Sequence, residues 1–456
     1  MTHPQMPDTL IESQHLYTSD EKTTVFSPGA LAFSQGNIIA VGTPETVRQQ
    51  LGPLPSTCTT LQLPNHTLLP GLINAHAHSA MALLRGYADD LPLMTWLQEH
   101  IWPAEQKWVS PEFVADGTRL ALTEMLLSGT TTFTDMYFFP ETVAEVAQAA
   151  GVRAHLACPI FDFPTAWGSG PDEYLAKTQS LLERYATDST HSIRIGFGPH
   201  APYTVSDQPL ESIAELAATH NSFVQMHVHE TAQEVNEALS KTGERPLNRL
   251  HRLGLLRDNF QAVHATCLTP EDIELLASTH SHVVHCPESN LKLASGFSPI
   301  AALLQAGVNV ALGTDGAASN NDLDLFSEMK TASLLAKAVA QDTTVLPANQ
   351  ALALATRYAA KALGCEQQLG ELRTGAAADV IAVDLSAPNT QPLHNLSSQL
   401  AYALNSQQVT HVWIAGRPVV RNRELLTLDQ ADIHARTRAG HDALHAQTNA
   451  NIDGII

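Results

Sequence analysis

The chain has 456 residues, of which 44% are hydrophobic, so it can bury a large core and is longer than one ordinary domain. It carries 46 acidic and 25 basic residues, giving a formal net charge of −21, and it contains no basic block. Such a surface repels phosphate groups, so we expect neither a nucleic-acid partner nor binding to an anionic membrane. An uninterrupted apolar run of about 18 residues, long enough to span a bilayer, does not occur.

The cysteines and the N-terminus indicate where the protein resides. The five cysteines are scattered and lack CxxC spacing: Cys58, Cys158, Cys267, Cys286 and Cys365. We interpret them as reduced side chains of a cytoplasmic protein. The N-terminal stretch MTHPQMPDTL has neither the basic nor the apolar segment of a secretory signal. The sequence leaves the oligomeric state open, a homo-oligomer being one alternative.

Along the chain, β-like runs come first and an alternating region follows. Short runs such as Asn37–Gly42, separated by Gly, Pro and Ser turns, fill the first 65 residues. From about 66 to 370, helical patterns alternate with strand-like runs: 119–128 precedes the strand 130–135, and 210–219 precedes the strand 222–227. This alternation predicts a parallel sheet covered by helices, either a closed barrel or an open doubly wound sheet.

Strand-like texture returns near the C-terminus, at 378–384 and 409–420, and residues 425–447 are typical of a terminal helix. We expect the strands of both chain ends to pair as a small composite β-sandwich. The predicted division therefore places the N-terminal half of this β-sandwich at 1–65 and the α/β region at 66–370. The C-terminal half of the β-sandwich and the terminal helix then occupy 371–456.

The most informative run is LLPGLINAHAH at 68–78, a predicted buried strand that ends in His76 and His78. Side chains alternate along a strand, so both imidazoles point to the same side. Two neutral imidazoles at a strand end can share one divalent metal. Because a bare HxH is weak evidence, further ligands have to come from other strand ends.

Three later runs supply such groups: His227, His229 and Glu230 at the end of the strand-like run 223–230, His264 within 261–265, and Asp315 at the end of 308–315. Barrel enzymes place their chemistry at the carboxyl ends of the strands. His227 and His229 lie on the same side of their predicted strand, so either can be the third ligand. We favour His227, which puts Glu230 on the following turn.

Taken together and in this order, seven blocks resemble the amidohydrolase superfamily, in particular its single-metal nucleoside and heterocycle deaminases: PGLINAHAH (70–78), WPAE (102–105), GPHAPYT (198–204), QMHVHE (225–230), VHATCL (263–268), HCPESNLKLASG (285–296) and ALGTDGAASNN (311–321). The resemblance covers nearly the whole chain. It implies a (β/α)8 barrel of the TIM type with the composite β-domain beside it. It also implies hydrolytic deamination of a purine nucleoside at C6, giving the inosine analogue and ammonia. The expected substrates are 5′-methylthioadenosine, S-adenosylhomocysteine and, more weakly, adenosine.

We expect His76, His78, His227 and Asp315 to bind one Zn²⁺ per chain, although this ligand set also suits Fe²⁺, Co²⁺ or Mn²⁺. Such a metal lowers the pKa of its bound water and so provides a hydroxide nucleophile. Asp315 would also accept the proton of the attacking water. Glu230 would carry a proton to the ring nitrogen and then to the leaving amine.

The resemblance adds further roles. His264 matches the histidine that orients the water, Glu105 the glutamate that binds ribose hydroxyls, and His200 a histidine that contacts the substrate, as Glu230 and Asp315 would also do. We interpret the remaining candidates as structural polar residues (Asp135, Ser289 and Asn290) or as surface or helix-end histidines (His155, His220, His251, His280, His282 and His285).

One departure from the family concerns the loop 159–170, which contains no basic residue. Family members that accept the amino-acid tail of adenosylhomocysteine carry arginines there. Phe161, Phe163 and Trp167 offer apolar surface instead, which suits a methylthio group better than a carboxylate that needs a bidentate partner. We therefore expect methylthioadenosine to be the better substrate, unless these aromatic side chains only pack the loop.

Two other functions remain as alternatives. A related amidohydrolase can act on another heterocycle, as guanine-type deaminases and triazine hydrolases do. Glu230 argues against a chloride leaving group, which needs no proton, and Glu105 argues against a substrate without ribose. A metal-binding scaffold without turnover is the second alternative, and the complete set of acid and base residues argues against it.

Overall fold

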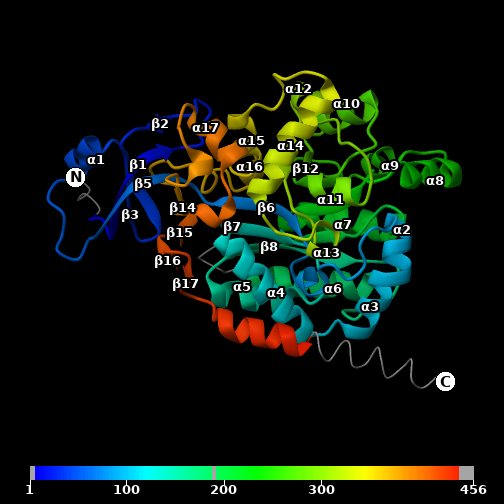
Figure 1. Ribbon diagram of the computed structural model, residues 1–456. Helices are drawn as coiled ribbons and strands as arrows, with labels where there is room; N and C mark the ends of the chain where they lie inside the picture. The colour runs from blue at the N-terminus through cyan, green and yellow to red at the C-terminus, as the bar shows by residue number, and fades with distance from the viewer. Residues whose placement is uncertain (1–5, 187–191, 441–456) are drawn as a thin grey trace.

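The computed structural model describes residues 6–186 and 192–440. Figure 1 shows a barrel ringed by helices with a separate sheet beside it, drawn in blue and orange. Eight parallel strands form the barrel sheet in chain order: β6 (Leu72–Ala77), β7 (Thr130–Asp135), β8 (Arg153–Ile160), β9 (Ile193–Pro199), β10 (Val224–Val228), β11 (Phe260–His264), β12 (His282–His285) and β13 (Val310–Leu312).

The barrel closes between its first and last strands. A parallel bridge joins Ala77 to Asp315, and the amide of Asp315 donates to the carbonyl of His76 at 3.0 Å. This contact brings the end of β6 next to the end of β13. The predicted (β/α)8 barrel is thereby confirmed, and the open doubly wound sheet is excluded.

Helices follow the barrel strands: α4 (Pro111–Leu127), α5 (Pro140–Ala150), α6 (Pro171–Tyr185), α7 (Asp207–His220), α8 (Ala232–Thr242), α9 (Pro246–Arg252), α10 (Pro270–Ser278), α11 (Pro287–Lys292), α12 (Ile300–Gln305), α13 (Ala317–Asn320), α14 (Leu325–Ala340), α15 (Ala348–Leu354) and α16 (Arg357–Ala362). Polar caps fix where they begin. Ser110 caps α4 by accepting from the amide of Phe113 at 3.2 Å, and Thr269 with Asp272 forms a capping box on α10. The predicted helical pattern at 119–128 lies in α4 apart from its last residue, the C-cap Ser128, and the pattern at 210–219 lies within α7.

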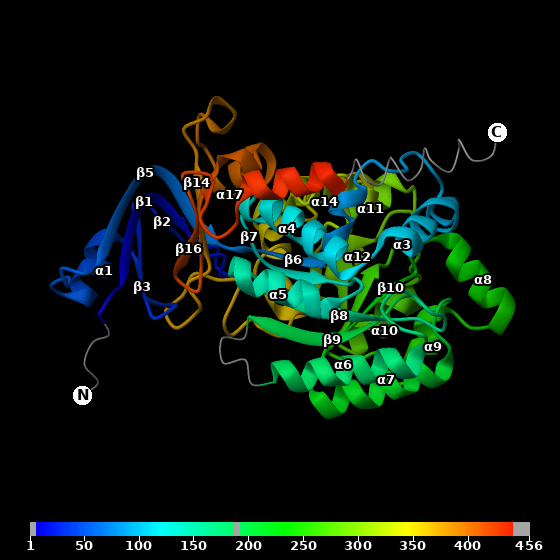
Figure 2. The same ribbon diagram turned by 90° about the horizontal axis from the view of Figure 1, so that it is seen from below.

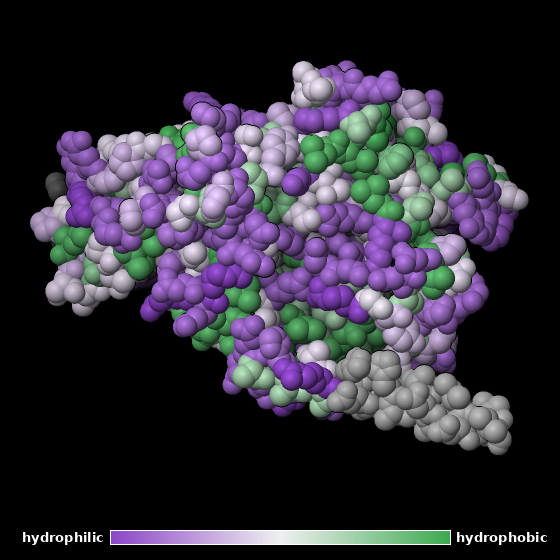
Figure 3. Space-filling view, viewed as in Figure 1, coloured by the Kyte–Doolittle hydropathy of each residue, from purple (hydrophilic) through white to green (hydrophobic). Residues whose placement is uncertain are grey.

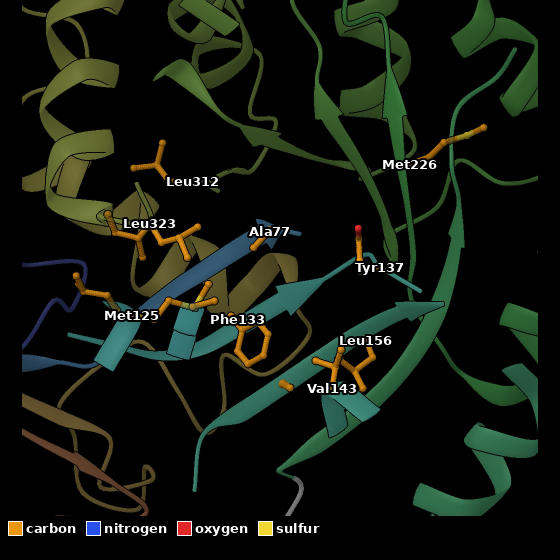
Figure 4. Packing of buried hydrophobic residues seen from close by; sticks show 14 of the residues in the cluster. Ala77, Met125, Phe133, Tyr137, Val143, Leu156, Met226, Leu312 and Leu323 are labelled. Carbon is orange, nitrogen blue, oxygen red and sulfur yellow. The ribbon is translucent and has the colours of Figure 1, made fainter. Parts of the chain in front are cut away.

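Shorter helical segments complete the description: α1 (Pro44–Leu51), η1 (Ser79–Leu84), α2 (Leu93–Thr95), η2 (Trp96–Ile101), α3 (Trp102–Trp108), η3 (Pro388–Thr390), α17 (Leu396–Ser398), η4 (Gln399–Ala403) and η5 (Ser406–Gln408). Between strands and helices lies a core of apolar side chains. Phe133 of β7, Leu156 of β8 and Val143 of α5 gather there, each fully buried (Figure 4). Burial of each such side chain contributes roughly 1.5–3 kcal/mol.

The separate sheet combines strands from both chain ends (Figure 2). Its nine strands are β1 (Thr9–Tyr17), β2 (Val25–Phe26), β3 (Gly29–Ser34), β4 (Asn37–Gly42), β5 (Thr59–Pro70), β14 (Val380–Asp384), β15 (Val409–Ile414), β16 (Arg417–Arg421) and β17 (Glu424–Leu425). β14 pairs antiparallel with β5, which joins the two ends of the chain. A composite β-domain is therefore confirmed, with hydrogen bonds linking its strands into one mixed sheet. The boundaries at 65 and 370 stay predictions.

The terminal helix begins later than expected. Leu425 still belongs to β17, and helical residues run from 430 to 440, where the described residues end. Asp429 explains this start, because its Oδ1 accepts from the amides of Ala431 and Asp432 at 3.0 and 3.1 Å. The rest of the predicted helix, 441–447, lies outside the described residues.

The prediction was wrong for three histidines expected at the surface. His155 on β8 and His282 and His285 on β12 are 2%, 5% and 1% exposed. Barrel strands are covered on both faces, so polar residues on them are buried too. The other three are exposed, as predicted: His220, His251 and His280.

The surface is mostly hydrophilic on the face in Figure 3, in keeping with the excess of acidic residues. Within the ranges of the chain that the structure describes, no helix has both the length and the apolar character needed to cross a bilayer.

Candidate active site

The predicted metal ligands meet at the carboxyl ends of the barrel strands. The Nε2 atoms of His76 and His227 lie 3.2 Å apart. Oδ1 of Asp315 lies 3.5 Å from Nε2 of His76 and 3.2 Å from Nε2 of His78. The ligand atoms of the three histidines are all within 4.8 Å of one another, so one ion can contact them together.

The second ring nitrogen of each histidine is already bonded. Nδ1 of His78 lies 2.6 Å from the carbonyl oxygen of Met136, and Nδ1 of His227 lies 2.8 Å from that of His200. A carbonyl oxygen only accepts, so Nδ1 donates, and in the neutral ring Nε2 keeps its lone pair. Lone pairs and a carboxylate oxygen that converge in a buried place repel one another unless a cation lies between them. Three nitrogens and one oxygen therefore fit a divalent metal of the zinc type.

The charge of Asp315 also favours a cation here. Burial lowers the pKa of His78, but the hydrogen bond and the charge of Asp315 outweigh burial and raise this pKa to about 9. A proton is therefore held between His78 and Asp315 at neutral pH when no metal is bound. A metal has to displace this proton, so its affinity rises with pH.

Asp315 is held by three donors. Its Oδ2 accepts from the hydroxyls of Ser289 and Ser319 at 2.7 and 2.9 Å, and its Oδ1 accepts from the amide of Gly316 at 2.8 Å. Burial would raise its pKa, but its contacts with the rings of His76 and His78, together with the charge of His78, hold the pKa well below its usual range. Asp315 is therefore ionised and fixed in orientation.

Glu230, in contrast to Asp315, has a raised pKa. Its Oε1 accepts from the hydroxyl of Ser295 at 3.1 Å, and its Oε2 lies 3.8 Å from Nε2 of His264. Burial, together with the negative charge of Asp315, raises the pKa of Glu230 to about 8. At neutral pH this carboxyl group is protonated and can act as an acid.

His264 is oriented by Asn290, whose Oδ1 lies 2.9 Å from Nδ1 of the ring. With Nδ1 donating to this oxygen, Nε2 of the neutral ring is an acceptor. Burial lowers the pKa of His264, which keeps the ring neutral. His264 can therefore accept a hydrogen bond from a neighbouring water and orient it.

The structure places His227, and not His229, among the potential ligands. The strand β10 ends at Val228, and His229 has a left-handed φ of 54°, which breaks the side-chain alternation. Nε2 of His229 accepts from the amide of Leu247 at 3.3 Å, away from the cluster. The expectation that both histidines share one side of a strand fails because the strand has ended.

One cavity connects most of these groups, and the segment from α2 to α3 walls it on one side. Its lining residues include His78, His200, His227, Glu230, His264, Asp315, Glu105 and Tyr137. Burial raises the pKa of Glu105 to about 7, while a hydrogen bond with Tyr137 lowers it in part. The ring of His200 stacks on Phe161 with centroids 4.9 Å apart. The structure therefore brings the predicted site residues to this cavity, except that His76 does not line it and instead contacts His227 and Asp315, which do.

Residues 67–419 match the model of the Amidohydrolase family. The chain belongs to this family. It is 49% identical over 447 residues to the 5-methylthioadenosine/S-adenosylhomocysteine deaminase of Saccharophagus degradans, covering 98% of this chain and 99% of the relative. A protein of the same name from Syntrophobacter fumaroxidans is 46% identical, covering 94% of this chain and 97% of the relative.

Among solved structures, this amidohydrolase is similar to an adenosine deaminase from Xanthomonas campestris with bound zinc. The TM-score is 0.94 at 48% identity, covering 97% of this chain and 100% of the other. The atrazine chlorohydrolase of Arthrobacter aurescens, with a TM-score of 0.88 at 24% identity, covers 95% of this chain and 99% of its own and shares the fold alone.

In this amidohydrolase a hollow beside the main cavity, here called the aromatic hollow, is lined mostly by aromatic and uncharged side chains, with Glu105 at the border that it shares with the main cavity. Phe161 and Phe163 have ring centroids 5.0 Å apart, and Trp102 lies 6.3 Å from Phe163. Trp167 does not reach the hollow: it is 2% exposed and stacks on Tyr174 with centroids 5.8 Å apart. Two of the three predicted aromatic residues are therefore available to a substrate.

No unpaired basic side chain borders these spaces, as far as the described residues go. In the described part of the chain, no lysine or arginine lines the main cavity or the aromatic hollow. A second hollow, which adjoins the main cavity at Tyr203 and Glu230, is lined by Lys241 and Arg249 among other residues. Lys241 pairs with Glu237 at 2.9 Å and Arg249 with Asp207 at 2.7 Å. A carboxylate bound there would have to compete with these existing ion pairs.

Proposed function

We propose that this amidohydrolase hydrolytically deaminates 6-aminopurine nucleosides. The enzyme converts 5′-methylthioadenosine and water into the inosine counterpart and ammonia. It deaminates S-adenosylhomocysteine and adenosine with lower kcat/KM. The observation that carries the proposal is the pair of carboxyl groups in one cavity, with Glu230 protonated and Asp315 ionised. Attack at C6 needs a base for the water and an acid for the ring nitrogen at the same time.

His76, His78, His227 and Asp315 would hold one divalent ion in this proposal, with Zn²⁺ as first candidate because the similar adenosine deaminase binds zinc. When bound, the metal supplies the activation of a water molecule as nucleophile. Fe²⁺, Co²⁺ and Mn²⁺ suit the same four ligands.

The protein's own groups divide the proton transfers. Asp315 accepts a proton from the attacking water, and His264, fixed by Asn290, orients this water through Nε2. Glu230 donates its proton to the ring nitrogen, then takes up the hydroxyl proton of the adduct at C6 and passes it to the leaving amine. The proton that Asp315 accepted afterwards restores the acid form of Glu230. A carboxyl group with a pKa near 8 is suited to give up and regain a proton near neutral pH.

The substrate would lie across the cavity towards Glu105. Glu105 accepts hydrogen bonds from the ribose hydroxyls, and His200 contacts the nucleoside from the side of β9. The 5′ substituent then reaches Phe161 and Phe163. A methylthio group gains about 0.8 kcal/mol for each methyl or methylene buried there. The zwitterionic tail of adenosylhomocysteine finds no free basic partner in that hollow, so its desolvation is not compensated.

An ammonia-release assay of the purified enzyme tests this proposal. The panel is methylthioadenosine, adenosylhomocysteine, adenosine, guanine and a triazine. We expect kcat/KM for methylthioadenosine to exceed that for adenosylhomocysteine about tenfold or more, on the order of 1.4 kcal/mol in transition-state binding, with adenosine below methylthioadenosine.

Two results would reject elements of the proposal. Equal or better efficiency with adenosylhomocysteine would show that another group meets its carboxylate, and the argument from the aromatic hollow would be wrong. Turnover of guanine or a triazine alone would favour the alternative of an amidohydrolase acting on another heterocycle.

A further inference from the structure

His76 differs from the other two histidines of the cluster in the partner of its Nδ1 atom. His78 and His227 contact backbone carbonyls, whereas Nδ1 of His76 lies 2.7 Å from Oε1 of the Gln225 side chain. A glutamine amide can present either its oxygen or its NH₂ group, and this choice decides which ring nitrogen of His76 carries hydrogen. The orientation of Gln225 therefore matters for metal binding.

Backbone carbonyls fix this orientation. The second terminal atom of Gln225 lies 2.9 Å from the carbonyl oxygen of Ala75 and 2.6 Å from the side chain of Gln261. Because the Ala75 carbonyl only accepts, this atom has to be the NH₂ nitrogen. The oxygen of Gln225 is then the atom that faces His76, so Nδ1 of His76 donates.

Gln261 in turn fixes the amide orientation of Gln225. Gln225 and Gln261 are paired residues on the neighbouring strands β10 and β11. The terminal nitrogen of Gln261 donates to the carbonyl oxygen of Ala362 at 2.8 Å. Ala362 is the last residue of α16, where a helix leaves its carbonyls without intrahelical donors. Gln261 therefore has to present its oxygen to the nitrogen of Gln225.

We propose that Gln225 and Gln261 are positioning residues for His76, forming an amide chain that starts at the Ala362 carbonyl and fixes the imidazole in its Nδ1–H tautomer. Nε2 of His76 then points its lone pair at the metal site before any ion is bound. The proposal rests on the proposed metal role of His76. His76, Gln225 and Gln261 are each 0% exposed, so water cannot replace a lost partner.

The chain predicts graded effects of substitution. Gln225→Leu removes the acceptor of His76, and we expect zinc affinity to fall about 10–100-fold, the usual loss when such an outer partner is removed. Gln261→Leu leaves Gln225 with its bond to Ala75, so the loss should be smaller. Gln261→Glu restores the acceptor for Gln225 but places an oxygen against the Ala362 carbonyl, so it should not rescue affinity.

Two measurements on the full chain test the proposal. Zinc affinity is measured by competition with a chelator for the wild type and the three glutamine variants. Thr178→Val is the matched control, since Thr178 is buried and donates to the Tyr174 carbonyl on α6, and it should retain wild-type affinity. The tautomer is read by nitrogen–proton correlation NMR of the metal-free wild type, with the His76 signals assigned by their loss in His76→Ala.

The outcomes separate this inference from the metal assignment. An Nδ1–H signal for His76, weakened or mixed in Gln225→Leu, supports the amide chain. An Nε2–H tautomer in the wild type overturns it without any variant, and so does zinc affinity within twofold of wild type in Gln225→Leu. If His76→Ala itself keeps full affinity, the metal assignment is wrong, and this result is distinct from the failure of the glutamine chain.

Discussion

Glu230 and Asp315 show at the residue scale how one cavity holds two carboxyl groups in opposite protonation states. Burial and the charge of Asp315 raise the pKa of Glu230 to about 8, whereas contacts with His76 and His78 outweigh burial and keep the pKa of Asp315 low, so that Asp315 is ionised. Separated pKa values of this kind assign the acid and the base of a site.

Glu230→Gln tests the acid. Glutamine keeps the size and hydrogen bonding of the side chain but cannot transfer a proton, so we expect turnover to fall about 10²–10⁴-fold with the metal retained. In the wild type, kcat should decline as pH rises through the Glu230 pKa of about 8, where this group loses its proton. Steady-state kinetics over pH, with metal analysis of each sample, measures both. Glu211→Gln on the exposed face of α7 is the control, and turnover within a few-fold of wild type in Glu230→Gln would leave Glu230 a structural role only.

The sequence reveals the histidines of the site but not the polar residues that orient them. His76 and His78 are found because two imidazoles near a strand end are uncommon. Gln225, Ser289 and Asn290 act through side chains that are ordinary polar types, and their partners lie far along the chain. Ser289 and Asn290 belong to the block HCPESN, which follows a strand end, and that position is the one signal that could have found them.

His282 permits a test of a buried histidine outside the site. Burial lowers its pKa to about 4, and its Nε2 donates to the carbonyl of Asp258 at 2.9 Å. Because the pKa is lower in the folded state, this group binds a proton more readily when unfolded, and the wild type loses stability as pH falls from about 6.5 towards 4. His282→Gln removes this dependence. The wild-type stability relative to the variant should fall by about 1.4 kcal/mol per pH unit below 6.5, measured by urea unfolding. Parallel pH dependences of the two proteins would contradict the prediction.

At the scale of elements, Arg153 and Asp379 join the barrel to the separate sheet. Nε and Nη2 of Arg153, at the start of β8, donate to the two carboxylate oxygens of Asp379 at 2.8 and 3.1 Å. The side chains are 9% and 5% exposed. Asp379 also accepts from the amide of Ala415 at 2.8 Å, so it links β8 to the turn after β15.

Asp379→Asn should destabilise the protein markedly. The amide keeps the hydrogen bond from Ala415 but leaves the Arg153 charge without its carboxylate, a change that costs about 3–5 kcal/mol in a buried pair. Chemical unfolding curves of the two proteins measure this difference. Glu145→Gln is the control, because its pair with Arg184 is 61% and 54% exposed and should matter by less than about 1 kcal/mol. A loss for Asp379→Asn as small as in this control would show that the ion pair does not hold the two sheets together.

The helices and strands that the sequence predicts are those whose hydrophobic residues recur with a clear period. The conformation of the remaining segments depends on tertiary contacts. The strand 130–135 and the helices α4 and α7 are expected from pattern alone. The wall of the cavity, α2 to α3, has no such pattern: the segment WLQEHI at 96–101 forms the π-helical η2 between two short helices. Its Trp96, Leu97 and Ile101 are buried against the rest of the cavity wall, so packing and not local propensity shapes it.

At the scale of the whole molecule, alternation of strands and helices predicts a parallel sheet but not its closure. Closure depends on the meeting of β6 and β13, whose residues are more than two hundred positions apart in the chain. No local pattern encodes that contact, and the resemblance to a family was what favoured a barrel. The same contact brings Asp315 beside His76, so closure of the barrel brings two of the proposed metal ligands together.

Metal binding should therefore stabilise the molecule as a whole. The proposed ligands lie on β6, directly after β6, on β10 and in the turn after β13, so an ion that binds them favours the closed barrel over the unfolded chain. At free zinc about 1,000 times Kd, this linkage adds about 4 kcal/mol to the free energy of unfolding. We expect elemental analysis to find about one divalent ion per chain and a chelator to lower the unfolding temperature.

His76→Ala should remove the metal, the activity and the zinc dependence of this temperature while leaving a folded protein. His229→Ala is the matched control, because His229 is a buried histidine on the same turn as Glu230 but bonds the Leu247 amide, and it should keep the metal. Full metal occupancy in His76→Ala, or loss of the metal in His229→Ala alone, would reject the ligand assignment.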